Sequence, residues 1–347
     1  ALTGATHLAA VASATATRDD VAAWADELRR TGTPDAARLA LDLALALGHP
    51  LDVHQIAFQQ NHPLVAMAPD AAYRGTLDDD HRALVDADDG AAATALSDVL
   101  AILAEVAGLL WPDTTDGLAR AGLAGATRIP ATSTAAAVAT FPRVAAAVGA
   151  SASLFQLAAM PSAGDPLDVR VVCGATPVVV LGPRALATDA DPGVVRAALA
   201  RAVALTLPSR VIAAGLAAAD GARLIAAVAR LFGPPPLRAA IARTVADEEV
   251  QRAYDEVVRS ALPVRIRTRL EQALATATAP ELDLAPHRAR GDRAADRVAV
   301  LLAPDITTAV ALVRQRGGEL GHLVRLLCDP RTVAARARLG LGVRPAG

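Results

Sequence analysis

Three short apolar segments, rich in β-branched residues, stand close together in a chain whose other apolar residues mostly recur at helical spacing. They read SLFQLA, DVRVVCGA and PVVVLGP, and they are separated by proline, serine and glycine. Such segments are typical of strands. Because they form one cluster instead of alternating with helices, we predict a predominantly helical α+β fold in which a small sheet at about 152–181 packs against many helices.

Helical periodicity covers most of the remaining chain. Two helices are expected within 18–47, since Pro34 suits a first helical position and Gly48 suits the end of a helix. Prolines interrupt any period in 50–76, which we expect to be an irregular linker that wraps the rest of the molecule. Further helices are predicted at 91–111, 115–122, 133–149, 192–207, 209–231, 235–260, 263–278, 287–302, 305–315 and 318–327.

The first helical pair is alanine-rich and ends in LGHP. Over about 30 residues it resembles one unit of the tetratricopeptide repeat. The resemblance implies two parts, a tetratricopeptide-like hairpin at 1–50 and a helical body with a small sheet at 51–347. Ala1 is neither a starting Met nor part of a charged leader, so we expect that an upstream segment of a bacterial repeat protein precedes it. The compartment stays open, with the cytoplasm favoured.

All 34 basic residues are arginine. Codon bias of a GC-rich genome and recognition of phosphate or carboxylate by guanidinium groups are both open explanations. The formal net charge is only -2, and VRIRTRL at 264–270 lacks an aromatic ring for base stacking, so we expect no nucleic-acid partner.

No run of about 18 uninterrupted apolar residues occurs, so we expect no membrane insertion. Cys173 and Cys328 lie in apolar contexts and are predicted to be buried, reduced thiols.

The order of three segments along the chain is more informative than any single motif. PVVVLGPRALA predicts a strand, DPGVVRAALARAVALT a helix, and GDRAADRVAV, about 90 residues further on, a helix with spaced acids. This order resembles the zinc metallopeptidase family that includes the CAAX-processing and heat-shock-induced membrane peptidases. In that family the strand runs along the cleft, the first helix carries HExxH, and the later helix supplies a Glu ligand and an Asp four residues on. The resemblance covers 150–305.

The resemblance places Arg201 and Leu205 where the two zinc-binding histidines would stand, and Ala202 where the general-base Glu would stand. Asp292 falls at the Glu ligand and Asp296 at the following Asp. Arginine and leucine cannot bind zinc, and alanine cannot take a proton from zinc-bound water. We call these five residues the vestigial site, and we expect no metal, cofactor or catalytic residue there. Arg201 is expected either to bridge the two helices by pairing with an aspartate or to lie on the surface.

These observations favour a non-catalytic function in protein interaction or scaffolding, with a protein partner that the sequence does not identify. Two alternatives stay open. One is a hydrolase with an unrecognised site that uses Glu319 and His322 from GGELGHL together with Asp292 and Asp296. The other is a small-molecule sensor that uses the vestigial cleft. The oligomeric state is not predicted.

Overall fold

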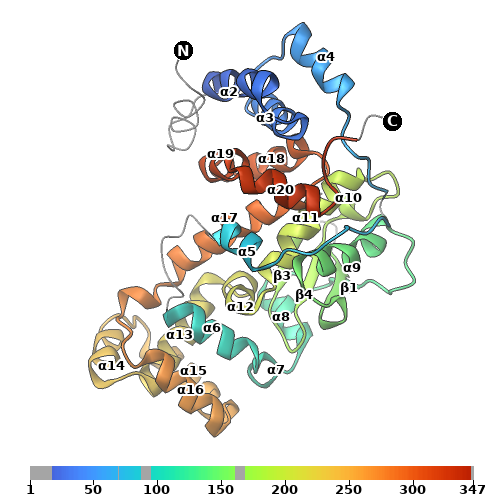
Figure 1. Cartoon of the computed structure of the whole chain (residues 1–347). Coiled ribbons are helices and arrows are strands. Elements are labelled where there is room, and N and C mark those ends of the chain that lie inside the picture. The colour runs from blue at the N-terminus through green and yellow to red at the C-terminus, as the bar shows by residue number, and fades with distance from the viewer. Residues whose placement is uncertain (1–17, 69, 87–94, 161–168, 345–347) are drawn as a thin grey trace.

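Helices dominate the structure, a computed structural model, and a single small sheet accompanies them (Figure 1). This confirms the predicted α+β class. The structure describes residues 18–68, 70–86, 95–160 and 169–344. Before and around the sheet it has α2 (Arg18–Thr31), α3 (Pro34–Ala46), α4 (Val53–Asn61), α5 (Asp79–Asp86), α6 (Ala95–Ala104), α7 (Ala107–Leu110), α8 (Thr114–Arg120), α9 (Ala136–Val148) and the 3-10 helix η2 (Ala152–Leu154).

The sheet and the later helices follow the same chain order. The strands are β1 (Thr127–Arg128), β2 (Gln156–Ala159), β3 (Val169–Val172) and β4 (Val178–Leu181). After them come α10 (Pro183–Leu186), α11 (Pro192–Leu205), α12 (Pro208–Gly215), α13 (Ala218–Phe232), α14 (Pro235–Ala242), α15 (Glu248–Ala261), α16 (Val264–Leu274), η3 (Pro280–Leu282), α17 (Leu284–Leu302), α18 (Ile306–Gln315), α19 (Gly321–Cys328) and α20 (Pro330–Arg338).

The prediction that 50–76 is irregular throughout was wrong, because α4 lies within it. Asp52 caps this helix by accepting hydrogen bonds from the backbone N–H groups of His54 and Gln55. The Gln55 side chain in turn accepts one from the Asp52 N–H, which completes a capping box. The signal was present in the sequence as an acid followed three residues later by glutamine.

Several predicted helices are in fact two. The stretch 209–231 divides into α12 and α13 because Gly215 packs against the backbone of Cys173, where a Cβ would overlap it, and the next residue is extended. The stretch 235–260 divides into α14 and α15, with Asp247 as a new N-cap. In 91–111 the first four residues lie outside the described part, and the rest divides into α6 and α7. α20 was not predicted.

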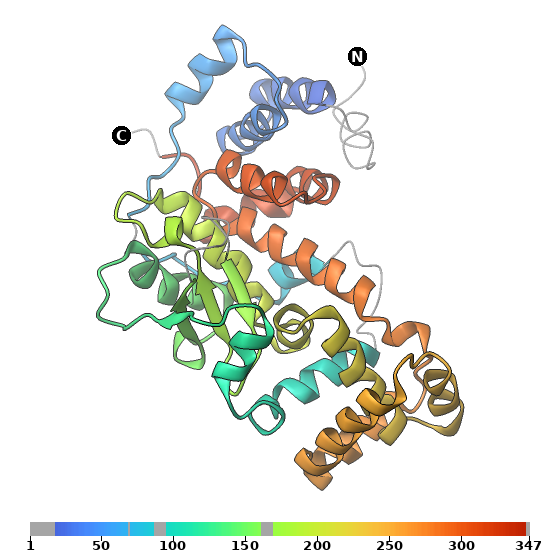
Figure 2. The ribbon, with the colours of Figure 1, turned by 180° about the vertical axis from the view of Figure 1, so that it is seen from behind.

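The sheet has the strand order β1-β2-β4-β3. β2 and β4 are parallel, whereas β1–β2 and β3–β4 are antiparallel. Three of the strands lie within the predicted sheet at 152–181, and β1 adds a fourth from outside it. β3 is therefore an edge strand, and Figure 2 shows it on the side of the sheet nearest α12 and α17.

α11 and α17 pack side by side through the middle of the molecule. Alanine lets the two backbones approach closely, and Ala198, Ala202 and Ala295 are all buried. Val195 and Leu199 of α11 are buried with them. One hydrophobic core continues from this pair of helices into α3, α9 and α18.

Buried arginines of this central pair bind backbone carbonyls of the chain between α4 and α6. Arg196 of α11 donates from Nη2 to the carbonyl oxygens of Ala68 and Ala71, at 2.5 and 2.9 Å. Arg297 of α17 donates to the carbonyl of Val85. A guanidinium group can satisfy several carbonyls at once, which suits it to a segment without regular hydrogen bonds. These contacts hold the connection before α6 against both helices.

The N-terminal hairpin packs on the C-terminal helices. α2 lies against α3, and α3 contacts α18, α19 and α20. Pro34 occupies a first helical position and Gly48 follows the C-cap with a φ of 89°, as predicted. The tetratricopeptide resemblance and the boundary near residue 50 stay predictions.

No single helix in the described ranges has both the length and the apolar composition that a membrane crossing needs. α11 and α12 meet that requirement only as a pair, and they are bent by 103° relative to each other.

Cys173 and Cys328 are both buried and unpaired by disulfide, as predicted. Burial raises the pKa of each thiol to about 12. At about pH 8 little of either cysteine is therefore in the reactive thiolate form, and burial keeps a thiol reagent away from both sulfur atoms. We expect Ellman's reagent to detect neither thiol in the native protein and both in guanidinium. Rapid reaction of either thiol without denaturant would contradict the structure.

Candidate functional site

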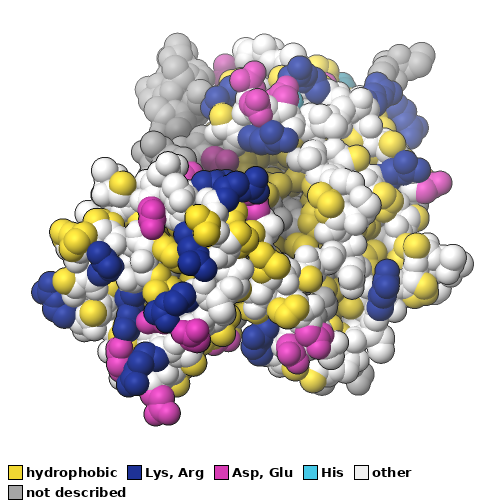
Figure 3. All heavy atoms as spheres, turned by 90° about the horizontal axis from the view of Figure 1, so that it is seen from below, with side chains coloured by type: hydrophobic (Ala, Val, Ile, Leu, Met, Phe, Trp, Pro, Cys, Tyr) yellow, Lys and Arg dark blue, Asp and Glu magenta, His cyan; other side chains and the backbone are white. Residues whose placement is uncertain are grey.

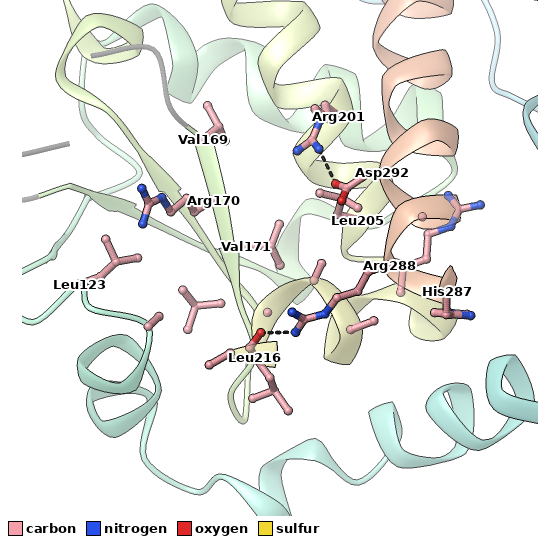
Figure 4. A pocket seen from close by; sticks show the side chains of 18 of the residues that line it. Leu123, Val169, Arg170, Val171, Arg201, Leu205, Leu216, His287, Arg288 and Asp292 are labelled. Carbon is pink, nitrogen blue, oxygen red and sulfur yellow. Dashed lines mark hydrogen bonds and ion pairs between the residues drawn. The ribbon is translucent and has the colours of Figure 1, made fainter. Parts of the chain in front are cut away.

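A cavity of about 370 Å³ opens where β3, α8, α11, α12 and α17 meet (Figure 4). Valines of β3 and small residues of α12 form much of its wall. The charged and titratable side chains that line it are Arg120, Arg170, Arg201, Arg210, His287, Arg288 and Asp292. The cavity thus contains five arginines against one aspartate.

Arg201 lines this cavity and joins α11 to α17. Its Nε donates to Asp296 Oδ1 at 2.7 Å, and its Nη2 donates to Asp292 Oδ1. Figure 4 shows Arg201 and Asp292 facing each other. Of the two arrangements expected for Arg201, the structure has the bridge between the helices, and the bridge uses both aspartates.

The two carboxylates of the bridge differ in exposure. The side chain of Asp296 is 9% exposed and that of Asp292 is 53% exposed, whereas Arg201 lies between them at 17%. Burial raises the pKa of Asp296, and the guanidinium of Arg201 opposes that rise. Asp296 therefore depends on Arg201 for its charge compensation much more than Asp292 does.

The other vestigial positions are apolar. Leu205 lines the cavity, and Ala202 is buried between the helices. A metal at this place would need three or four neutral imidazole or anionic ligands. Across the described ranges, no group of three or more His, Cys, Asp and Glu side chains comes together in a way that could hold a metal ion.

The residues of the alternative hydrolase site are only partly brought together. Gly318, at the start of GGELGHL, lies beside Asp296, whose Oδ2 is 3.6 Å from where a Cβ on that glycine would stand. His322 is buried, and Glu319 is exposed. Both aspartates proposed for that site are already held by Arg201.

The direction of the backbone groups of β3 follows from its neighbour β4. The N–H of Met160, just after β2, donates to the carbonyl of Leu181 at 2.8 Å, so Leu181 faces β2. Successive residues of a strand direct their N–H and C=O groups to opposite sides. Val178 and Val180 therefore face β3.

The antiparallel register pairs those two residues of β4 with Val172 and Arg170. Val169 and Val171 accordingly direct their N–H and C=O groups away from the sheet, toward the cavity that they line. Cys173 has the same orientation, and its N–H donates to the carbonyl oxygen of Gly215, the last residue of α12, at 3.2 Å. Within the described part of the chain, no other backbone hydrogen bond covers this edge of β3.

Of the five cavity arginines, only Arg201 was identified from the sequence. For the other four, the sequence offered no signal beyond the use of arginine for every basic residue. Arg210 pairs with Asp86 at 2.5 Å, and Arg288 donates from Nη2 to the carbonyl of Leu216. Burial lowers the pKa of Arg288, and the charge of Asp292 opposes that shift. Arg288 precedes Asp292 by four residues, which puts both on one face of α17. This spacing could have identified Arg288 from the sequence.

No family model, curated protein or solved structure matches the chain. The metallopeptidase and tetratricopeptide resemblances therefore stay predictions, and the function rests on the geometry of the site.

The unequal burial of the two carboxylates predicts unequal coupling to Arg201. We expect Arg201→Ala to cost about 1–4 kcal/mol of unfolding free energy, because it leaves Asp296 buried and unpaired. A double-mutant cycle with Asp296→Ala should give a clear coupling energy, and one with Asp292→Ala only about 0–1 kcal/mol. Equal coupling in the two cycles, or additivity in both, would contradict this assignment.

The same variant has a predicted pH dependence. Because the folded-state pKa of Asp296 is raised, its ionisation costs stability as the pH rises above the unfolded-state value. Removal of Arg201 increases that cost. The destabilisation by Arg201→Ala, measured by urea unfolding, should therefore be larger at neutral pH than near about pH 4, and a larger effect in acid would be inconsistent with it.

Proposed function

We propose that this chain is a non-catalytic protein-interaction module that holds an extended segment of a partner along the free edge of β3. The observation that carries the proposal is the placement of Val169 and Val171 in the wall of a cavity of about 370 Å³, with backbone groups that no described residue pairs. An extended peptide is the ligand that offers matching donors and acceptors at the strand spacing.

The absence of catalysis rests on the chemistry of the vestigial site. Arg201 carries a permanent positive charge at the place where the resemblance puts a zinc ligand, and both aspartates neutralise it. Ala202 offers no group to move a proton. A peptide bound beside this bridge would meet neither a metal-activated water nor a general base.

A partner segment is favoured over a small-molecule ligand by the shape of the contact. The edge of β3 presents backbone groups in a row, and residues from both faces of the strand line the cavity. Arg170 and Val172 belong to one face, and Val169 and Val171 to the other. The wall therefore follows the edge of a strand, which suits an added strand.

The surrounding surface does not favour nucleic acid. Figure 3 shows the molecule from below, hollowed between the part that carries α13–α16 and the part that carries the sheet, with basic and acidic side chains interspersed on both parts. Such a mixture lacks the one-sign field that phosphate backbones require.

The proposal predicts that the protein neither contains nor uses zinc. We expect protein purified without a histidine tag to hold far less than one zinc per chain by elemental analysis, and to leave casein uncleaved with or without added zinc. Arg201→His, Ala202→Glu and Leu205→His together should not create activity unless Asp292→Glu is added, because ligand reach must be correct to a few tenths of an ångström. Near-stoichiometric zinc in the unmodified protein would favour the hydrolase instead.

Peptide binding can be tested by closing the cavity. Ala217 and Ala218 are adjacent and exposed at the start of α13, but only Ala217 lines the cavity. We expect the wild-type protein to bind a subset of an array of short peptides of random sequence, Ala217→Trp to lose that binding, and Ala218→Trp to keep it. A wild-type protein that binds no peptide, or an Ala217→Trp variant that binds the same peptides equally well, would contradict the proposal.

A further inference from the structure

We infer that the segment held at the edge of β3 is acidic, and that Arg288 and Arg120 bind its carboxylates from opposite sides of the strand. This inference rests on the proposed function and specifies the class of peptide. It starts from the charge of the cavity, which five arginines and one aspartate line.

Two of these arginines are already neutralised. Arg201 is held by Asp292 and Asp296, and Arg210 is held by Asp86. The single aspartate of the cavity wall thus pairs with Arg201, and it acts on Arg288 only through its charge, without an ion pair.

Among the described residues, no carboxylate forms a hydrogen bond or an ion pair with Arg288. Its Nη2 donates to the carbonyl of Leu216, and its Nε is buried without a hydrogen-bond partner. Figure 4 shows it reaching from α17 across the cavity to that carbonyl. A partly buried guanidinium that has no hydrogen-bonded anion is stabilised by a carboxylate that supplies the missing acceptors.

Arg120 stands on the other side of β3. It is the last residue of α8, it is exposed, and it forms no ion pair with a described residue. It lines the cavity together with Leu123, which packs with Val172 on the face of the sheet opposite Val171. A carboxylate at this place would meet a guanidinium that is free to move onto it.

The alternation of side chains along a strand links the two arginines. Neighbouring residues of a bound strand point to opposite faces, so one faces the α17 side, where Arg288 lies, and the next faces the α8 side, where Arg120 lies. Two adjacent acidic residues would therefore be bound by different arginines. A neutral peptide would keep the backbone pairing but leave Arg288 without an anion.

The probe is a Thr- and Val-rich peptide with two adjacent glutamates at its centre, compared with the same peptide carrying two glutamines. Fluorescence anisotropy should give about tenfold or more tighter binding of the acidic peptide to the wild-type protein at low salt. The double variant Arg120→Gln with Arg288→Gln should bind both peptides alike, and Arg288→Lys should keep part of the preference. Arg290→Gln removes the same charge from α17 outside the cavity and should leave the preference unchanged.

Different outcomes would overturn the acidic preference alone or the peptide site at β3 as well. Equal binding of both peptides to the wild-type protein, lost in Ala217→Trp, would overturn the acidic preference and leave the proposed function standing. A preference that survives in the double variant would also overturn it. Binding of neither peptide, or binding that Ala217→Trp does not reduce, would contradict both the acidic preference and a peptide site at β3.

Discussion

The packing of α11 on α17 fixes the position of every other part of the site. Alanines let the two helices lie close together, and Arg201 of α11 binds two carboxylates of α17 beside the cavity. Arg196 and Arg297, one from each helix, then hold the connecting segments before α6 by their backbone carbonyls. β3 contacts α11 and α12, and its residues line the same cavity as residues of α11 and α17. Loss of the helix pairing would therefore separate the two walls of the cavity.

Local sequence patterns predicted which parts of the chain are helical and where the strands lie. They did not predict where helices break, because those breaks depend on distant neighbours. The division after Gly215 exists because the helix end meets the backbone of Cys173, some 40 residues earlier in the chain. The strand β1 is only two residues long and becomes a strand by pairing with β2. By contrast, α4 had a local signal in Asp52 and Gln55, and the prolines on either side concealed it.

The bridge between Arg201 and the two aspartates could be predicted, since the resemblance places α11 beside the later helix and opposite charges then meet. The arginine-lined cavity could not be predicted. Arg120, Arg170 and Arg288 come from α8, β3 and α17, and only the tertiary fold gathers them. That all three are arginines did not distinguish them either, because every basic residue of the chain is arginine. Guanidinium groups here serve in buried carbonyl contacts, in ion pairs and in the cavity wall, so composition alone cannot tell these roles apart.

Amide hydrogen exchange at β3, resolved by residue with NMR, tests the central claim most directly. In the free protein, the N–H groups of Arg170 and Val172 belong to the ladder with β4 and should be protected, whereas those of Val169 and Val171 should exchange much faster. Addition of the acidic peptide should slow exchange at Val169 and Val171 and leave the ladder residues as they were. Binding that leaves exchange at Val169 and Val171 unchanged would show that the partner segment does not pair with this edge, and would contradict the account.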